Sequence, residues 1–219
     1  MDDLVSIIMP TYNASKTIKE SINSVLKQTY TRWELLITDD CSDDDTVDIV
    51  MAYSRNDSRI KLFKNTENSG AGFSRNNSIQ NASGRFIAFL DSDDVWKHEK
   101  LEKQISFMVD NNYAFTYTFY RKMSEDGRKL SGIHPILKVD YNNLLKSNVI
   151  GCLTAIYDAS ILGKVYMPNL RKRQDMALWL SILKKIEYAY CLPQELAFYR
   201  ECINSLSSNK FKVLPYQWA

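Results

Sequence analysis

The first 95 residues alternate short apolar runs with helical patterns, and this alternation constrains the fold more than any other feature. Four apolar runs indicate buried β-strands, at residues 5–9, 33–38, 60–63 and 85–90. Apolar residues at helical spacing lie between them, within residues 18–26, 47–51 and 70–82. Parallel strands joined by right-handed helical crossovers fit this order. The sequence therefore predicts an α/β fold, with a doubly wound, mostly parallel sheet and helices on both of its faces.

Two local signals refine the element boundaries in this half. Pro10 is expected to end the first strand, because proline cannot donate to a ladder. Ser42, with Asp45 three residues later, resembles a capping box that would open the second helix.

The second half of the chain is less regular. Its patterns indicate helices and strands in mixed order, at residues 97–111, 114–123, 140–147, 151–157, 176–183 and 196–200. No internal repeat or low-complexity linker separates the two halves. We therefore expect one domain, residues 1–219, with a nucleotide-binding half of about residues 1–95 and a mixed, acceptor-binding half of about residues 96–219.

Composition excludes several classes of protein. The formal charge of +2 and the lack of a long basic run argue against a nucleic-acid partner. The four cysteines form no C-x-x-C pair, which fits reduced thiols in the cytoplasm better than a disulfide framework or a zinc site. Asp2 and Asp3 stand where a signal peptide would be basic, and no apolar stretch approaches the length of a membrane span. Any membrane contact is therefore expected to be peripheral.

Acidic residues follow the fourth apolar run, where ligands bind in open α/β sheets. Asp91 and Asp93 are two residues apart, so on an extended backbone they face the same side and could share one hard cation. The competing interpretation is a solvated acidic turn in which Asp91 or Ser92 caps the next helix.

Polar residues also follow the first and second strands, and parallel strands bring such ends to one edge of the sheet. A nucleoside diphosphate would fit this edge, with Tyr12 stacking on a base and Asp40 accepting from a ring N–H. Taken singly, Tyr12 could be a half-buried aromatic, and Asp39 and Asp40 could serve helix capping. Their joint occurrence favours a ligand site.

Seven stretches together resemble the inverting glycosyltransferases of family 2, which have the GT-A fold. They are residues 5–13, 39–46, 70–76, 84–94, 173–180, 197–200 and 204–210. The resemblance runs nearly end to end and keeps the motifs in the family's order. It implies a hexosyltransferase-type enzyme that uses a nucleotide-sugar.

The resemblance implies a donor site in the first half. Pro10, Thr11 and Tyr12 would line the base pocket, Asp40 would bind the edge of a uracil, and Arg75 would approach the donor. UDP is accordingly the expected nucleotide.

It also implies the reactive centre. Asp91 and Ser92 would contact the donor, and Asp91 and Asp93 would form the D-x-D element that holds Mn²⁺ or Mg²⁺ against the diphosphate. Asp175 would be the general base, which takes the proton of the acceptor hydroxyl as its oxygen attacks the anomeric carbon. No covalent intermediate is needed, so the configuration inverts.

Two departures from the family pattern stand out. Gln174 replaces a residue that is commonly Glu, which leaves Asp175 as the sole carboxylate of that motif. Residues 201–203 contain no histidine where many relatives have one. Arg200 and the basic residues 171–173 could add positive charge near the diphosphate or an anionic acceptor, although a solvated loop is the simpler interpretation of the triplet.

The expected function is metal-dependent, inverting transfer of a sugar, from a UDP-sugar to a hydroxyl of a glycan or lipid-linked acceptor in bacterial surface polysaccharide synthesis. The expected location is the cytoplasm, with peripheral contact at the inner face of the membrane. Two alternatives remain: a sugar nucleotidyltransferase, and a non-catalytic nucleotide-sugar-binding protein on the same fold. Residues 10–13 lack the Gly-rich phosphate loop expected of the first alternative, and Asp91, Asp93 and Asp175 argue against the second.

Overall fold

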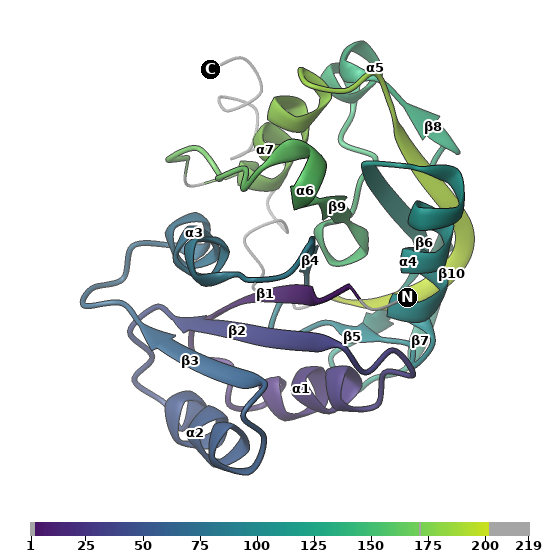
Figure 1. Ribbon diagram of the computed structural model, residues 1–219. Helices are drawn as coiled ribbons and strands as arrows, with labels where there is room; N and C mark the ends of the chain where they lie inside the picture. Colours follow the sequence, from purple (N-terminus) through teal and green to yellow (C-terminus); the bar gives the residue numbers. More distant parts are fainter. Residues whose placement is uncertain (1–2, 171, 202–219) are drawn as a thin grey trace.

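The computed structural model describes residues 3–170 and 172–201, and one mixed sheet runs through it (Figure 1). The strand order is β3-β2-β1-β4-β9-β6-β10-β5, with β7 beside β6 and β8 beside β10. The strands are β1 (Val5–Thr11), β2 (Trp33–Asp39), β3 (Ile60–Lys64), β4 (Phe86–Phe89), β5 (Val95–Trp96), β6 (Phe115–Ser124), β7 (Lys129–Ile133), β8 (Lys138–Val139), β9 (Ile156–Asp158) and β10 (Ala189–Glu201).

Seven α-helices and one 3-10 turn are seen in this part of the chain. They are α1 (Ile18–Leu26), α2 (Thr46–Asn56), α3 (Ala71–Asn81), α4 (Lys100–Asn111), α5 (Tyr141–Lys146), η1 (Cys152–Thr154), α6 (Ala159–Leu162) and α7 (Gln174–Leu183). The parallel ladders carry four to nine residue pairs, whereas the antiparallel ladders carry two or three. The predicted α/β fold with a mostly parallel sheet is therefore confirmed.

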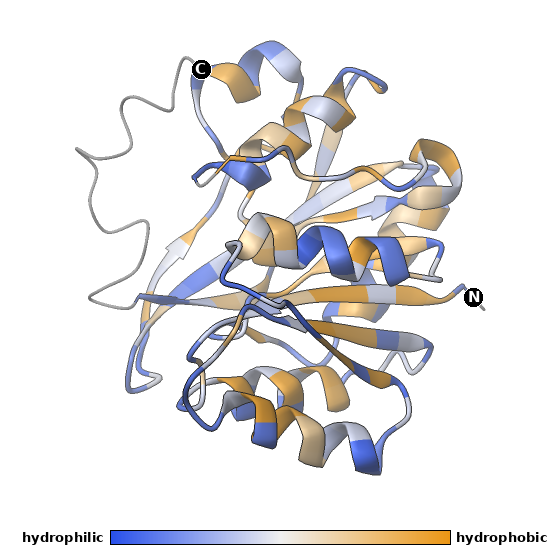
Figure 2. Ribbon diagram, turned by 90° about the vertical axis from the view of Figure 1, so that its left-hand side faces the viewer, coloured by the Kyte–Doolittle hydropathy of each residue, from blue (hydrophilic) through white to orange (hydrophobic). Residues whose placement is uncertain are grey.

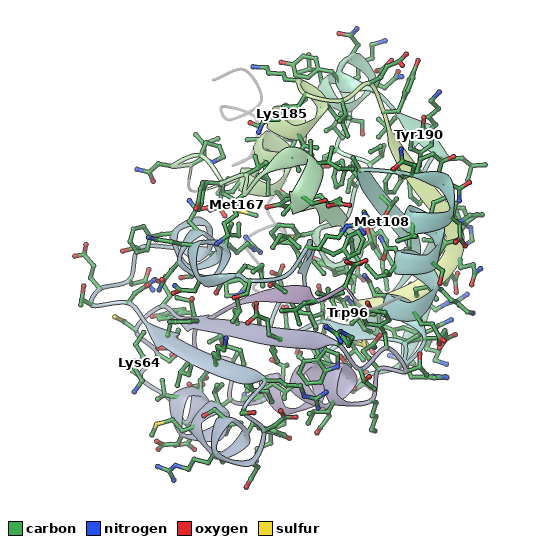
Figure 3. The ribbon with its side chains drawn as sticks, viewed as in Figure 1. Lys64, Trp96, Met108, Met167, Lys185 and Tyr190 are labelled. Atoms are coloured by element: carbon green, nitrogen blue, oxygen red, sulfur yellow. The ribbon has the colours of Figure 1, made fainter. Side chains whose placement is uncertain are left out.

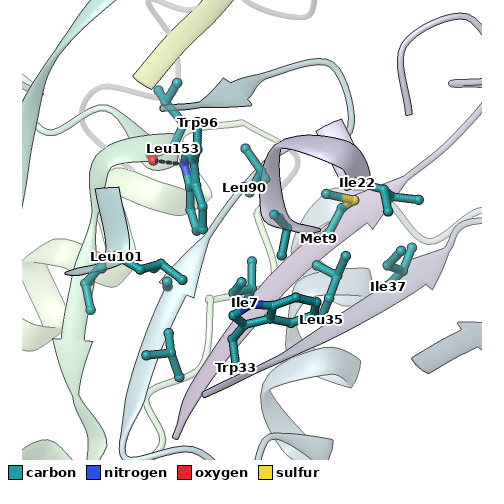
Figure 4. Packing of buried hydrophobic residues seen from close by; sticks show 14 of the residues in the cluster. Ile7, Met9, Ile22, Trp33, Leu35, Ile37, Leu90, Trp96, Leu101 and Leu153 are labelled. Atoms are coloured by element: carbon teal, nitrogen blue, oxygen red, sulfur yellow. Dashed lines mark hydrogen bonds between the residues drawn. The ribbon is translucent and has the colours of Figure 1, made fainter. Parts of the chain in front are cut away.

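The strands bury both faces of the sheet, since alternate side chains enter two separate cores. Ile7 and Met9 point into the core beneath α1, α2 and α4, whereas Ile8 points into the core beneath α3 and α7. Figure 4 shows the first core, where the Trp96 Nε1–H donates to the Leu153 carbonyl at 2.8 Å and so satisfies its one polar group. Figure 2 shows the first-half strands as largely hydrophobic ribbon between helices of mixed character.

Three predicted boundaries differ from the structure. Pro10 does not end β1: it pairs with Thr38 of β2, and its missing N–H is tolerated because β4 pairs with β1 only as far as Ile8. The strand expected at residues 151–157 is a 3-10 turn followed by the short β9. The strand expected at residues 196–200 extends from residue 189 to residue 201, with two register shifts around Glu195 that interrupt its alternation.

The capping box predicted at Ser42 and Asp45 is also wrong. Helix α2 begins at Thr46, and its Thr46 N–H bonds to the carboxylate of Asp44 at 2.9 Å. Asp44 also accepts from the Ser15 N–H at 3.0 Å, so it ties the loop after β1 to the start of α2. The Ser42 hydroxyl instead donates to Asp39.

Candidate active site

The ends of β1 and β2 are joined directly. The Asp40 N–H donates to the Thr11 carbonyl at 2.9 Å, which places the two polar segments side by side. Pro10 and Thr11 are buried, and the Thr11 hydroxyl has no partner among the described residues. Tyr12 is 52% exposed, so its ring is free to stack on a ligand. The expected base-binding residues therefore line one edge of the sheet.

Asp40 organises the loop that leads into α3. One of its carboxylate oxygens accepts from Asn65 Nδ2 at 2.7 Å and from the Ser69 N–H at 2.9 Å, and the other accepts from the Gly70 N–H at 2.7 Å. Gly70 has a φ of +88°, a left-handed conformation that side chains other than glycine rarely adopt. The Asp40 carboxylate is buried at this edge of the sheet, and its three hydrogen bonds fix the loop.

Asp39 has a structural role in the loop after β2. Its two carboxylate oxygens accept from the N–H and the hydroxyl of Ser42, at 3.0 and 2.5 Å. These bonds close a turn within the loop after β2. The Asp39 carboxylate therefore uses both of its oxygens in hydrogen bonds within the loop.

Arg75 of α3 lies at the centre of the site and links its two halves. Its guanidinium donates to Asp91 at 2.5 Å and to the side-chain Oε1 of Gln174 at 3.3 Å, and it contacts the Met167 sulfur at 3.9 Å. Met167, labelled beside α3 in Figure 3, is in turn held by two hydrogen bonds to Asn76. Burial opposes the charge on Arg75, but the carboxylate of Asp91 outweighs it and raises the pKa of Arg75.

The segment after β4 carries closely spaced carboxylates. Burial, and then the charge of Asp91, raise the pKa of Asp93 to about 6. Ser92 and Asp94 are buried, whereas the side chain of Asp91 is 29% exposed beside Arg75. Two carboxylates that repel each other in this way suit a divalent cation, which would relieve the repulsion. In the described part of the chain no cluster of three or more His, Cys, Asp or Glu that could hold an ion is found.

Arg200 clamps this acidic segment. Its backbone N–H donates to the Asp94 carboxylate at 2.9 Å, and its Nε donates to the Asp93 carbonyl at 2.8 Å. Its guanidinium also bonds the Glu125 carbonyl at 2.8 Å and the carboxylate of Glu20. Arg200 therefore holds the acidic segment against β10, the turn after β6, and α1, and its buried side chain is committed to these contacts.

Asp175 lies in the first turn of α7, and its charge interacts with Arg75. Burial raises its pKa, and the Met176 N–H, the charge of Arg75 and a hydrogen bond from Asn148 oppose that rise. The Asn148 amide donates to Asp175 Oδ2 at 3.1 Å. The Cys152 thiol interacts electrostatically with both Arg75 and Asp175, and burial raises its pKa well above the usual value.

Sequence reasoning missed one contact and undervalued another. Asn148 sits in a loop with no recognisable motif, so nothing in the sequence singles it out. Gln174 was noted only as a departure from the family, yet its side chain packs against Gly72 and meets Arg75. Residues 202–210 and Arg171 lie outside the described residues.

Comparison with known proteins identifies the family of this chain. The sequence model of Glycosyl transferase family 2 matches residues 6–186. The chain belongs to glycosyltransferase family 2. This glycosyltransferase is 50% identical to WfgD of Escherichia coli, a UDP-Glc:α-D-GlcNAc-diphosphoundecaprenol β-1,3-glucosyltransferase, over all of the chain and 85% of WfgD. It is 47% identical to TuaG of Bacillus subtilis (strain 168), a glycosyltransferase assigned provisionally to teichuronic acid biosynthesis, over 98% of the chain and 86% of TuaG.

Solved structures agree with the family. The glycosyltransferase superposes on S. aureus TarS 1–349 in complex with UDP-GlcNAc with a TM-score of 0.78 and 25% identity, over 92% of the chain. It spans 59% of that TarS chain, so it is shorter than this structural relative. The likeness confirms the GT-A fold. In residues 3–170 and 172–201 of the glycosyltransferase, no helix is both long and apolar enough to cross a membrane.

Proposed function

We propose that this glycosyltransferase moves a hexose from a UDP-sugar to a hydroxyl of a lipid-linked or glycan acceptor, with inversion at the anomeric carbon. The observation that carries the proposal is the bridge made by Arg75. It contacts Asp91 at the strand ends and Gln174, the neighbour of Asp175, on α7. The Arg75 guanidinium would thus contact both the donor site and the helix turn that carries the general base.

The relatives support the choice of substrates. WfgD is named for transfer of glucose from UDP-Glc to a sugar on diphosphoundecaprenol, and TarS is seen with UDP-GlcNAc. We therefore assign UDP to the donor and a diphosphate-linked lipid sugar to the acceptor.

The arrangement of the strand ends supports the following donor contacts. Tyr12 would stack on the uracil, with Pro10 and Thr11 forming the wall of the base pocket and Asp40 meeting the ring N–H. Ser92 and Arg75 would face the ribose and the diphosphate. Because its pyrophosphate is anionic, the donor would gain from a buried guanidinium at this position.

Asp91 and Asp93 would hold Mn²⁺ or Mg²⁺ in the proposed complex, and a solved relative, a Pyrobaculum calidifontis mannosyltransferase, is described with GDP-Man and Mn²⁺. The cation would supply positive charge to the departing diphosphate. Arg200 holds this segment by bonding the Asp93 carbonyl and the Asp94 carboxylate.

Asp175 would accept the proton of the acceptor hydroxyl while the oxygen bonds to the anomeric carbon. The bond from that carbon to the phosphate oxygen breaks, and its electron pair leaves with UDP. Because the oxygen attacks from the face opposite UDP, one displacement inverts the configuration. We further propose that about residues 1–95 bind the donor and about residues 96–219 bind the acceptor. The enzyme would work in the cytoplasm, peripherally at the membrane that carries its lipid-linked acceptor.

The test combines calorimetry with a transfer assay. UDP would be titrated into the protein with Mn²⁺ and with EDTA, and transfer would be followed from UDP-glucose to a synthetic GlcNAc-diphosphate lipid. Asp93→Ala should lose both metal-dependent binding and transfer, and Asp175→Asn should lose transfer alone. Asp48→Asn, on the exposed face of α2, is the control.

Full activity in Asp175→Asn would remove Asp175 as the base. Loss of UDP binding in that variant would instead place it in the donor site. Tight UDP binding without transfer to any acceptor would favour a binding protein over an enzyme.

A further inference from the structure

The Asn148 carboxamide is oriented from both ends. Its Oδ1 accepts from the Ile150 N–H at 3.3 Å, and its Nδ2 donates to Asp175 Oδ2 at 3.1 Å. The backbone donor decides which end of the amide faces the carboxylate, because Oδ1 must turn towards Ile150. The N–H of Asn148 is thereby aimed at Asp175 by its own loop.

We propose that Asn148 is a positioning residue for Asp175: it holds one carboxylate oxygen and leaves the other to receive the proton of the acceptor. This inference rests on the proposed function, in which Asp175 is the general base. An N–H donor stabilises the ionised carboxylate more than the protonated acid, so Asn148 also favours the form of the base that can accept a proton.

The loop suits contact with an acceptor. Asn148 is exposed, whereas Asp175 is half-buried, so the amide forms the solvent side of the carboxylate. The other groups that act on Asp175 are the Met176 N–H of α7, Arg75 from α3, Asp91 from the segment after β4 and the Cys152 thiol from η1. Arg75 donates its hydrogen bonds to Asp91 and Gln174. Among the described side chains, the neutral amide of Asn148 therefore provides the hydrogen bond that orients the Asp175 carboxylate.

Two substitutions distinguish the role of Asn148 in its own loop from its role in positioning Asp175. Asn148→Ser keeps a side-chain oxygen that can accept from the Ile150 N–H but is too short to reach Asp175. Asn148→Asp keeps the acceptor for Ile150 and replaces the N–H donor by a carboxylate that repels Asp175. Asn142→Ala, an exposed asparagine on α5, is the matched control.

Both variants should bind UDP with Mn²⁺ as the wild type does, because the contact lies on the acceptor side. Transfer should fall by about 10- to 100-fold, the usual effect of losing a partner that orients a functional group. The acid limb of the pH profile of kcat/KM should move to higher pH, further in Asn148→Asp than in Asn148→Ser, because the ionised base has lost a donor.

A second measurement does not depend on activity. Carbon NMR titration of the Asp175 carboxyl, assigned by its loss in Asp175→Asn, should show a higher pKa in Asn148→Ser. An Asp175 pKa that is the same in Asn148→Ser and in the wild type would overturn the inference, whether or not the protein transfers sugar. If the wild type transfers no sugar but the Asp175 pKa is raised in Asn148→Ser, the inference is supported and the proposed function alone is refuted. Reduced transfer with an unmoved acid limb and a lower melting temperature would show that Asn148 serves only its loop.

Discussion

The hydrogen bonds of Asp40 give a quantitative prediction for Asp40→Asn. Three donors, from Asn65, Ser69 and Gly70, share its two carboxylate oxygens. An asparagine offers one oxygen and one NH₂ group, so in either orientation at least one of these partly buried donors faces another donor. A lost hydrogen bond to a charged group costs about 2 kcal/mol, which corresponds to a fall of about 4–8 °C in the melting temperature of a chain of this length.

Thermal unfolding followed by circular dichroism, without nucleotide, measures this effect. Asp43→Asn is the control, because it makes the same chemical change at an exposed residue of the neighbouring loop. UDP affinity should fall together with stability, because the loop at Gly70 would loosen. An Asp40→Asn protein that melts like the wild type would refute the reasoning, and if it also lost UDP binding, Asp40 would be a base contact without a part in folding the loop.

Two further substitutions test the first half of the fold. Gly84→Ala would place a Cβ 2.6 Å from the backbone N of Ser6, so β1 must shift, and urea unfolding should show a loss of about 1–3 kcal/mol. Partial burial opposes ionisation of Asp44, but hydrogen bonds from Thr46 and Ser15 outweigh it and lower the pKa of Asp44 to about 2. Because this folded-state pKa is depressed, Asp44→Asn should cost about 1 kcal/mol at pH 7, after allowance for solvent screening, and the difference should disappear as the pH falls from about 4 to about 2. A difference that stayed constant over this pH range would contradict the assignment of the stabilisation to the ionised carboxylate.

The first half of the fold could be predicted because its signals are local. The apolar runs that became β1, β2 and β4 are buried on both faces, and the helical patterns between the first-half strands are short and regular. The second half could not be predicted as well. β10 carries Pro193 and two register shifts, so its alternation breaks, and β5 and β8 are two-residue strands that exist only through pairing with it.

The candidate site shows the same division. Motif residues such as Asp91 and Arg75 were named from sequence, and the structure brings these two into contact. Asn148 and the clamp made by Arg200 depend on residues more than 25 positions apart in the chain. Such contacts carry no periodicity or spacing, so only the folded chain reveals them.

The antiparallel pairing of β4 with β9 affects how this protein is made on the ribosome. β4 ends at Phe89, but β9 ends at Asp158, 69 residues later. At ordinary rates of synthesis, one edge of the apolar strand β4 would remain unpaired for about 3–14 s before β9 is made. The nascent first half therefore presents an open edge to other chains during each round of translation, and chaperone binding or aggregation would compete with completion of the sheet in that interval.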